Sequence, residues 1–179
     1  MLFTTIIGSG FLASSFKKYE NLFKELNICI YAAGVSNSLC QDSDLFEKDK
    51  NRLANFSKQM DKKNIILYFS TCSIDDPSRN NNEYIKNKLI IENFIKLNFE
   101  KYLIIRLPEV IGYTKNENTL IKFLFNKIKN KQTFNLWNKA TRSVIDIEDV
   151  VKILIDLLSN KKPVNKIINI ANPIKYSSI

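Results

Sequence analysis

At 179 residues, with 45% hydrophobic and 25% charged side chains, the chain has the size and composition of one soluble globular domain. It contains no histidine, which excludes Ser-His-Asp and Cys-His catalysis and any histidine-ligated metal site. Acid–base chemistry would therefore depend on Tyr, Lys, Asp, Glu or a thiol. The net charge of +9 comes mainly from lysine, and its densest cluster, residues 127–131, lacks interleaved aromatic side chains, so we expect no nucleic-acid partner.

The cysteines and the N-terminal segment indicate a cytoplasmic protein. The 3 cysteines are an odd number without metal-type spacing, which suits a reducing compartment and predicts no metal site. No apolar run is long enough to cross a bilayer, so we expect no membrane association. The apolar residues 1–16 are not preceded by Lys or Arg and are interrupted by Gly8 and Gly10, which favours a buried strand and its turn over a secretory leader.

Short apolar runs alternate with longer amphipathic segments along the chain. Continuous apolar runs, typical of strands buried on both faces, occur at Phe3–Ile7, Ile28–Ala32, Ile65–Ser70, Leu103–Leu107 and Lys166–Ile170. Helical patterns occur at Asp44–Met60, Glu83–Leu97, Thr119–Lys129 and Glu148–Ser159. Strands separated by helices predict right-handed βαβ crossovers and a Rossmann-like α/β fold, with one parallel sheet and helices on both faces.

The N-cap and the spacing of apolar residues can be assigned in two of the predicted helices. Asp44 is the expected N-cap of the first of them, which has apolar residues at Leu45, Leu53 and Phe56. The helix over Glu83–Leu97 has apolar residues at helical spacing, namely Leu89, Ile90, Phe94 and Leu97.

The first predicted strand leads directly into a glycine-bearing turn, Gly8-Ser9-Gly10-Phe11-Leu12-Ala13. In a G-x-G-x-x-A turn, glycine lets the chain bend sharply and lets a pyrophosphate approach backbone N–H groups at the start of the next helix. The pattern alone is weak, but a Rossmann unit has it in this place, directly after the first strand. We predict a dinucleotide site here, with a turn that binds no ligand as the alternative.

The acidic residue that normally follows such a turn is missing. A dinucleotide site has an acid roughly 20 residues further on, at the end of a second strand, where it binds the adenine ribose. By Tyr31 this chain is already in a strand that ends in Ala32-Ala33-Gly34, so most of one βα unit is absent. Glu20 and Glu25 lie in the interval but fit a helix surface better. The sequence therefore predicts a sheet shortened in the region of its second and third strands.

Candidate catalytic groups follow the third predicted strand. Thr71 stands at the end of that strand, and Tyr84 and Lys88 stand at i and i+4 on one face of the next helix. A phenol with a pKa near ~10 is a weak base at neutral pH. A lysine cation nearby is expected to lower that pKa and make Tyr84 a proton donor and acceptor. Chance alone predicts about one such pair in a chain this rich in lysine, so the order of the motifs carries the argument.

That order resembles the extended short-chain dehydrogenase/reductases, the NAD-dependent epimerase/dehydratase family. Besides the glycine turn, the Ala-Ala-Gly strand end and the Y-x-x-x-K pair, three later segments are similar to family segments. Residues 103–112, LIIRLPEVIG, resemble L-R-x-P-x-V-x-G; residues 142–150, RSVIDIEDV, resemble R-D-F-I-H-V-x-D-V; and residues 166–177 resemble the turn after the last strand. The resemblance covers nearly the whole chain in the family's order.

The resemblance implies roles for individual residues. Thr71, Tyr84 and Lys88 match the catalytic hydroxyl, the acid–base group and the lysine that binds the nicotinamide ribose. Residues matching the family's NAD or NADP contacts are Gly8, Gly10, Phe11, Leu12, Ala13, Ala33, Gly34, Lys88 and Pro108. Arg142 matches an arginine that grips the diphosphate of a nucleotide-linked sugar, for which a guanidinium is well suited.

The implied activity is hydride transfer between the cofactor and a nucleotide-activated sugar, giving ketoreduction or epimerisation. Cys72 and Ser73 stand where dehydratases carry Asp-Glu, which disfavours a dehydratase. Cys72 is expected to be a buried, inert thiol, because no histidine is present to activate it. The alternative is a non-catalytic Rossmann-like nucleotide-binding or regulatory module, favoured by the missing ribose-binding segment.

The resemblance also bears on organisation and assembly. We expect residues 1–179 to form one Rossmann-like domain in which residues 113–145 contribute a small substrate-side region. Relatives continue into another helix and complete a substrate domain, so the chain is either an unusually short member or a fragment. The oligomeric state is open, with a homodimer through the helix of Tyr84 as the assembly that the family implies.

Overall fold

The computed structural model describes residues 5–79, 81–113, 120–135, 141–161 and 163–177. Its main sheet has five strands in the order β1-β2-β3-β4-β7, and every neighbouring pair is parallel. The strands are β1 (Ile6–Ile7), β2 (Ile28–Tyr31), β3 (Ile65–Thr71), β4 (Tyr102–Leu107) and β7 (Lys166–Asn169). The five predicted strands are therefore confirmed, although residues 3–4 of the first prediction lie outside the described residues.

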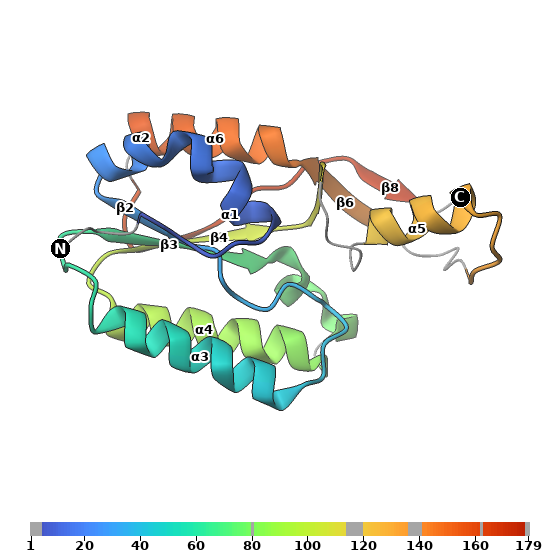
Figure 1. Cartoon of the computed structure of the whole chain (residues 1–179), viewed down its shortest axis with the longest axis horizontal. Helices are drawn as coiled ribbons and strands as arrows, with labels where there is room; N and C mark the ends of the chain where they lie inside the picture. The colour runs from blue at the N-terminus through green and yellow to red at the C-terminus, as the bar shows by residue number, and fades with distance from the viewer. Residues whose placement is uncertain (1–4, 80, 114–119, 136–140, 162, 178–179) are drawn as a thin grey trace.

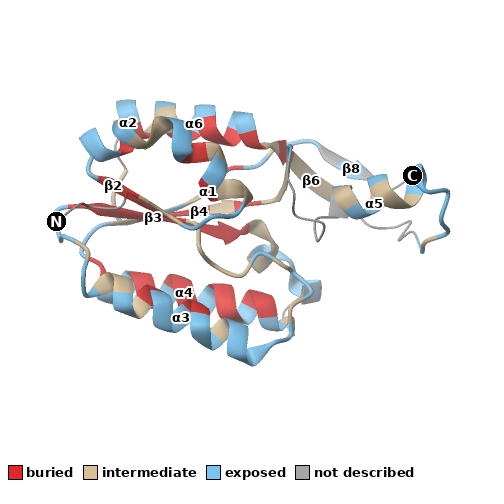
Figure 2. Cartoon of the chain, in the orientation of Figure 1, coloured by how far each residue is buried: buried red, intermediate tan, exposed pale blue. Residues whose placement is uncertain are grey.

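Helices cover both faces of this sheet (Figure 1). One face carries α1 (Phe11–Phe16), α2 (Glu20–Glu25) and α6 (Ile147–Asn160), and the other carries α3 (Ser43–Ser57) and α4 (Glu83–Asn98). Each face of the sheet has its own hydrophobic core, and successive strand residues alternate between the two. Leu67 belongs to the core under α1 and α6, whereas Tyr68 belongs to the core under α3 and α4. The Rossmann-like parallel sheet with two helical layers is confirmed, and Figure 2 shows its buried interior.

The sheet is shortened on one side, as the sequence predicted. β1 is the edge strand and pairs with β2, which leads into the Ala-Ala-Gly turn. Within the described residues, no strand lies beyond β1. The short helices α1 and α2, with a 3₁₀ turn between them, fill the interval in which a complete Rossmann sheet would insert further strands.

Two details of the predicted helices are wrong. The N-cap of α3 is Asp42 rather than Asp44, because Asp42 Oδ1 accepts hydrogen bonds from the N–H groups of Asp44 and Leu45 at 2.9 and 3.2 Å. In α4 the apolar residues whose spacing indicated the helix do not form its buried face: Leu89, Ile90 and Leu97 are exposed. The helix is apolar on more than one side, and the sheet contacts the side that carries Tyr84, Lys88, Ile91, Glu92 and Ile95.

A second, smaller sheet extends from one end of the first. It pairs β5 (Glu109–Ile111) in parallel with β6 (Thr141–Asp146), and β6 in antiparallel with β8 (Lys175–Ser177). Helix α5 (Leu120–Lys129) lies beside it in Figure 1. The sequence did not predict these strands, because none of them is a continuous apolar run. No helix among the described residues is long and apolar enough to span a bilayer.

Candidate active site

Parallel pairing brings the candidate residues to one edge of the main sheet. The glycine turn follows β1, Ala33 and Gly34 follow β2, Thr71 ends β3, and Pro108 follows β4. In open α/β sheets, ligands bind beyond the carboxyl ends of the strands. Tyr84 and Lys88 reach this region from α4, which packs against β3. Apart from Arg142, the residues to which the family resemblance gives a role therefore come from five separate parts of the chain near the carboxyl ends of the strands.

The two glycines of the first turn have different surroundings. Gly8 has a φ of +125°, and a Cβ added there would stand 2.5 Å from the carbonyl oxygen of Ala32, so only glycine fits against the end of β2. Gly10 is the N-cap residue of α1, and a Cβ added there would meet no atom within 4 Å. Gly8 is therefore required for packing, whereas Gly10 faces open space.

This difference predicts separable effects of two alanine substitutions. Gly8→Ala should lower the free energy of unfolding by about 1–3 kcal/mol or more, because it adds backbone strain and a steric clash. Gly10→Ala should change stability by less than about 0.5 kcal/mol, as expected for an uncrowded surface position. Urea denaturation of both variants measures this, and equal losses of stability would contradict the assignment.

Other residues of the turn are packed into the protein. Ala13 is buried, while Phe11 and Leu12 are partly buried against the core on the α6 side. The Phe11 ring also lies against Gly112, where an added Cβ would stand 2.9 Å from Phe11 Cζ. Beside the turn, a hollow of about 170 Å³ is lined by Ile6, Gly8, Ser9, Ala13, Ser14, Lys17 and Glu20. Glu20, which the sequence placed on a helix surface, therefore lines the hollow nearest the glycine turn.

Lys88 is the most unusual residue of the site. Its side chain is buried, and Nζ donates hydrogen bonds to Tyr68 Oη at 3.2 Å and to the carbonyl oxygen of Phe69 at 3.3 Å. The same nitrogen lies 5.0 Å from the ring centroid of Tyr68 and 5.5 Å from that of Tyr84. Burial lowers the pKa of Lys88 to about 8, against the opposing charges of Asp49 and Glu92.

Thr71 and Tyr84 belong to neighbouring parts of the same region. Thr71 is buried at the last position of β3, where its Oγ1 accepts a hydrogen bond from the N–H of Ser73 at 3.1 Å. Because α4 runs back antiparallel to β3, Tyr84 in its first turn lies nearer than Lys88 to the strand end at Thr71. The convergence of the Thr71 and Tyr84 oxygens stays a prediction.

The electrostatics of Tyr84 differ from the sequence-based expectation. We expected the lysine cation to lower the phenol pKa, but the pKa of Tyr84 is raised, first by burial and then by the charges of Glu109 and Asp49. Lys88 lies over the face of the ring and hydrogen-bonds to Tyr68 instead. Tyr84 is therefore protonated at neutral pH in this state, which suits it to donate a proton.

Arg142 and Pro108 lie where β4 passes into the second sheet. Pro108 separates β4 from β5, and it is partly buried. Arg142 is a partly buried residue of β6, paired with Tyr176 of β8. Because Glu109 pairs with Val144 two residues further along β6, Arg142 lies near the junction of the two sheets. Whether its guanidinium faces Tyr84 stays a prediction.

A polar network that the sequence did not predict fixes α4 to the sheet. Arg106 Nε and Nη2 donate to the two carboxylate oxygens of Glu92 at 3.0 and 2.9 Å, and Glu92 is fully buried. Arg106 Nη1 also bonds to Asp75 at 3.2 Å, and Asn169 donates to the other oxygen of Asp75 at 3.3 Å. Glu92 stands at i+4 from Lys88, which is the signal that could have placed it on the buried face.

Cys72 has the properties of an unreactive thiol. Its Sγ donates to the carbonyl oxygen of Arg106 at 3.3 Å, and the residue is partly buried. Burial, assisted by the charge of Asp75, raises the pKa of Cys72, which disfavours the nucleophilic thiolate. Among the described residues, no group of His, Cys, Asp and Glu side chains could hold a metal ion.

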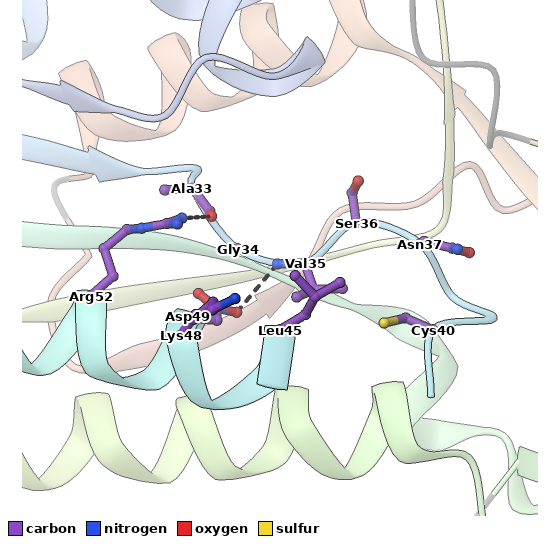
Figure 3. A pocket seen from close by; sticks show the side chains of 10 residues that line it. All are labelled: Ala33, Gly34, Val35, Ser36, Asn37, Cys40, Leu45, Lys48, Asp49 and Arg52. Atoms are coloured by element: carbon purple, nitrogen blue, oxygen red, sulfur yellow. Dashed lines mark hydrogen bonds between the residues drawn. The ribbon is translucent and has the colours of Figure 1, made fainter. Parts of the chain in front are cut away.

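A larger hollow of about 410 Å³ lies between the β2–α3 loop and α3 (Figure 3). Its lining includes Gly34, Val35, Cys40, Asp49 and Arg52. Arg52 Nη1 donates to the carbonyl oxygen of Ala33 at 2.7 Å, and Asp49 Oδ2 accepts from the N–H of Val35 at 3.2 Å. No role was predicted for Asp49, although it stands at i−4 from the buried Leu53, where a helix pattern would have an apolar residue.

Solved structures resemble this fold across most of the chain. A UDP-glucuronic acid 4-epimerase from Bacillus cereus, in complex with UDP-glucuronic acid and NAD, matches 97% of this chain with a TM-score of 0.70 and 16% identity. The Bordetella bronchiseptica enzyme WbmG, in complex with NAD, matches 88% with a TM-score of 0.63 and 19% identity. A dTDP-glucose 4,6-dehydratase from Streptomyces venezuelae, with NAD bound, matches 87% with a TM-score of 0.68 and 15% identity.

The chain spans 69%, 55% and 56% of the length of these three structures, respectively. A search of curated protein sequences gives no match. The model of the NAD dependent epimerase/dehydratase family matches residues 29–171, from β2 to the end of β7, so the match rests on the later motifs and not on the glycine turn. The chain belongs to the NAD dependent epimerase/dehydratase family.

Proposed function

We propose that the protein is an NAD(P)-dependent reductase or epimerase of a nucleotide-activated sugar, with Tyr84 as its acid–base group. The observation that supports this most is the buried Lys88 ammonium beside the ring of Tyr84, close to the carboxyl end of β3. Burying an isolated ammonium is costly, so a folded protein retains one where its charge has a use. Family membership and the nucleotide-sugar complexes of the similar structures point to the same substrate class.

The residues present fit two parts of a nicotinamide cofactor. Gly10 leaves open space at the start of α1, where a diphosphate would lie, and Lys88 would hold the nicotinamide ribose. The region that would receive the adenosine of the cofactor differs from the one in a complete Rossmann sheet, because β1 is the edge strand among the described residues. In place of an acid on a second strand, the hollow beside β1 offers Ser14, Lys17 and Glu20. When bound, the cofactor supplies hydride transfer.

The chain's own groups would handle the proton and the substrate oxygen. Tyr84 Oη, protonated at neutral pH, would donate its proton to the sugar oxygen in the reductive direction and take it back in the oxidative direction. Thr71 Oγ1 already accepts from Ser73, which leaves its hydroxyl proton to orient the same sugar oxygen. Lys88 would stabilise the phenolate as it forms. Ketoreduction and epimerisation both use this proton transfer.

Arg142 is proposed to bind the diphosphate of the substrate. Arg142→Ala should then raise KM for a nucleotide sugar far more than it lowers kcat, because it removes binding that is common to the ground state and the transition state. Initial rates with UDP-glucose, UDP-glucuronic acid and dTDP-glucose would measure this. Lys152→Ala, which removes an exposed cation on α6, is the control. A fall in kcat with unchanged KM would contradict the assignment.

A second candidate function is a non-catalytic nucleotide-binding or regulatory module, which the edge position of β1 favours. Thermal shift and fluorescence titration with NADH and NADPH separate the two. A ligand that binds only the folded state stabilises it by about 2.7 kcal/mol at one hundred times Kd. We expect one of the two cofactors to raise the melting temperature of the wild type, and Gly10→Ala to weaken that effect. No response to either cofactor would favour the module.

A further inference from the structure

Asp49 is a buried carboxylate on α3. Within α3, only Asp49 and Leu53 are buried, and Asp49 is 2% exposed. Removing a carboxylate from water is costly unless hydrogen bonds or an opposite charge compensate it. An apolar residue at this position would pack against the sheet without that cost. The charge at Asp49 therefore needs a partner.

The hydrogen bonds of Asp49 do not satisfy it. Its Oδ2 accepts one bond, from the N–H of Val35 at 3.2 Å, and its Oδ1 is buried with no partner among the described residues. Figure 3 shows the side chain pointing from α3 toward the backbone of Gly34 and Val35. A carboxylate can accept several hydrogen bonds, so the compensation must come largely from charge.

Gly34 leaves a small gap that both Asp49 and Lys88 face. A Cβ added at Gly34 would stand 3.2 Å from Asp49 Oδ2 and 3.6 Å from Lys88 Nζ. The carboxylate reaches this point from α3 and the ammonium reaches it from α4, while β2 ends beneath them. Two opposite, buried charges thus border the same gap. Their attraction is strong because little water screens it.

The other charged and titratable groups near Lys88 are accounted for. Glu92, on α4 itself, accepts hydrogen bonds from Nε and Nη2 of Arg106. Tyr68 on β3 and Tyr84 on α4 are neutral phenols whose pKa values burial raises. Asp49 is therefore the anion facing Lys88 that lacks a cation of its own in the described part of the chain.

We propose that Asp49 is a positioning residue: across the gap at Gly34, its carboxylate holds the Lys88 ammonium charged and directed at Tyr84. This role rests on the proposed function of Lys88. A neutral lysine would not stabilise a Tyr84 phenolate and would lose one of the N–H donors for a ribose. Asp49 thus acts through Lys88 and contacts neither substrate nor cofactor.

The test is the titration of Lys88 by NMR of its ¹³Cε group, in the full chain without cofactor. Asp49→Asn keeps the shape and removes the charge, so it should lower the pKa of Lys88 by about one unit or more, as loss of a nearby opposite charge does. Glu47→Gln, an exposed neutralisation on the same helix, is the control and should leave the pKa unchanged. An unchanged pKa of Lys88 in a folded Asp49→Asn variant would overturn the proposal.

Two further measurements keep the test decisive. In the wild type, the Asp49 carboxyl ¹³C shift should move at the pH where Lys88 titrates, which needs no variant; no such coupling overturns the proposal. If the protein turns over a nucleotide sugar, Asp49→Asn should lose activity about fivefold or more at pH 8 and recover it at pH 6, because acid restores the ammonium. A loss that is independent of pH overturns the positioning role. Absence of turnover in the wild type overturns the proposed function instead, and leaves the NMR result standing.

Discussion

Tyr84→Phe should reduce turnover by about 10²–10⁴-fold, the contribution of a positioned acid–base group, while leaving cofactor affinity unchanged. The phenyl ring keeps the packing of the buried Tyr84 side chain and removes only the hydroxyl that would carry the proton. The measurement is kcat with a nucleotide sugar, together with Kd for NADH or NADPH and the free energy of unfolding. Large changes in stability would point to a structural role.

Tyr102→Phe is the matched control for this substitution. Tyr102 begins β4 at the opposite end of the sheet from Pro108 and is partly buried. Its loss of a hydroxyl should leave kcat unchanged. Equal turnover by Tyr84→Phe and the wild type would overturn the role of Tyr84 as the acid–base group, whereas no turnover by the wild type would favour the nucleotide-binding module.

Lys88→Met should lower both turnover and cofactor affinity. It removes the ribose contact and the electrostatic stabilisation of the Tyr84 phenolate together, and each charge-assisted hydrogen bond contributes about 1.5–3 kcal/mol. Methionine fills a similar volume, so the fold should persist. Lys86→Met is the control, because Lys86 lies exposed on the same helix and pairs with Glu83 on the helix surface at 2.7 Å. Loss of turnover with unchanged cofactor affinity would contradict the ribose contact.

Lys88→Met should also change the pH dependence of the free energy of unfolding, which can be measured without any enzyme activity. The folded protein loses the Lys88 proton near pH 8, whereas the unfolded chain keeps it to about its ordinary pKa of 10.5. Between these values the unfolded state binds more protons, so the free energy of unfolding contributed by Lys88 rises with pH and is lowest below pH 8. Lys88→Met should abolish this rise. Denaturation midpoints between pH 7 and 10 would show it, and a parallel profile would contradict a buried Lys88.

The fold was predictable because the strands that build the main sheet are continuous apolar runs. β2, β3 and β4 are almost entirely buried, so their burial pattern is written directly in the sequence. The short α1 and α2 carry no such signal, nor do the strands of the second sheet. Helix α4 was found, but its buried face was not, because apolar residues occupy more than one of its sides.

The candidate site could be predicted only where an ordered motif exists. Thr71, Tyr84 and Lys88 were proposed from their order along the chain, and their burial could not be read from it. Asp49 was missed because it lies in a run of charged residues that reads as a solvated surface. Only the fold, which buries Asp49 beside the gap at Gly34, distinguishes it from exposed neighbours such as Glu47. The direction in which the Tyr84 pKa shifts was missed for a similar reason, because it is set mainly by burial.

The crystal structure of the protein with NADH or NADPH bound would test whether Thr71, Tyr84 and Lys88 act on the cofactor and its substrate. We predict the diphosphate over Gly10, the nicotinamide ribose hydroxyls on Lys88 Nζ, and the nicotinamide ring beside the Thr71 and Tyr84 hydroxyls. These two hydroxyls should converge on one substrate position within hydrogen-bond reach, about 2.6–3.2 Å. A cofactor bound elsewhere, or one bound at Gly10 while the Tyr84 hydroxyl faces away from its nicotinamide ring, would contradict this prediction.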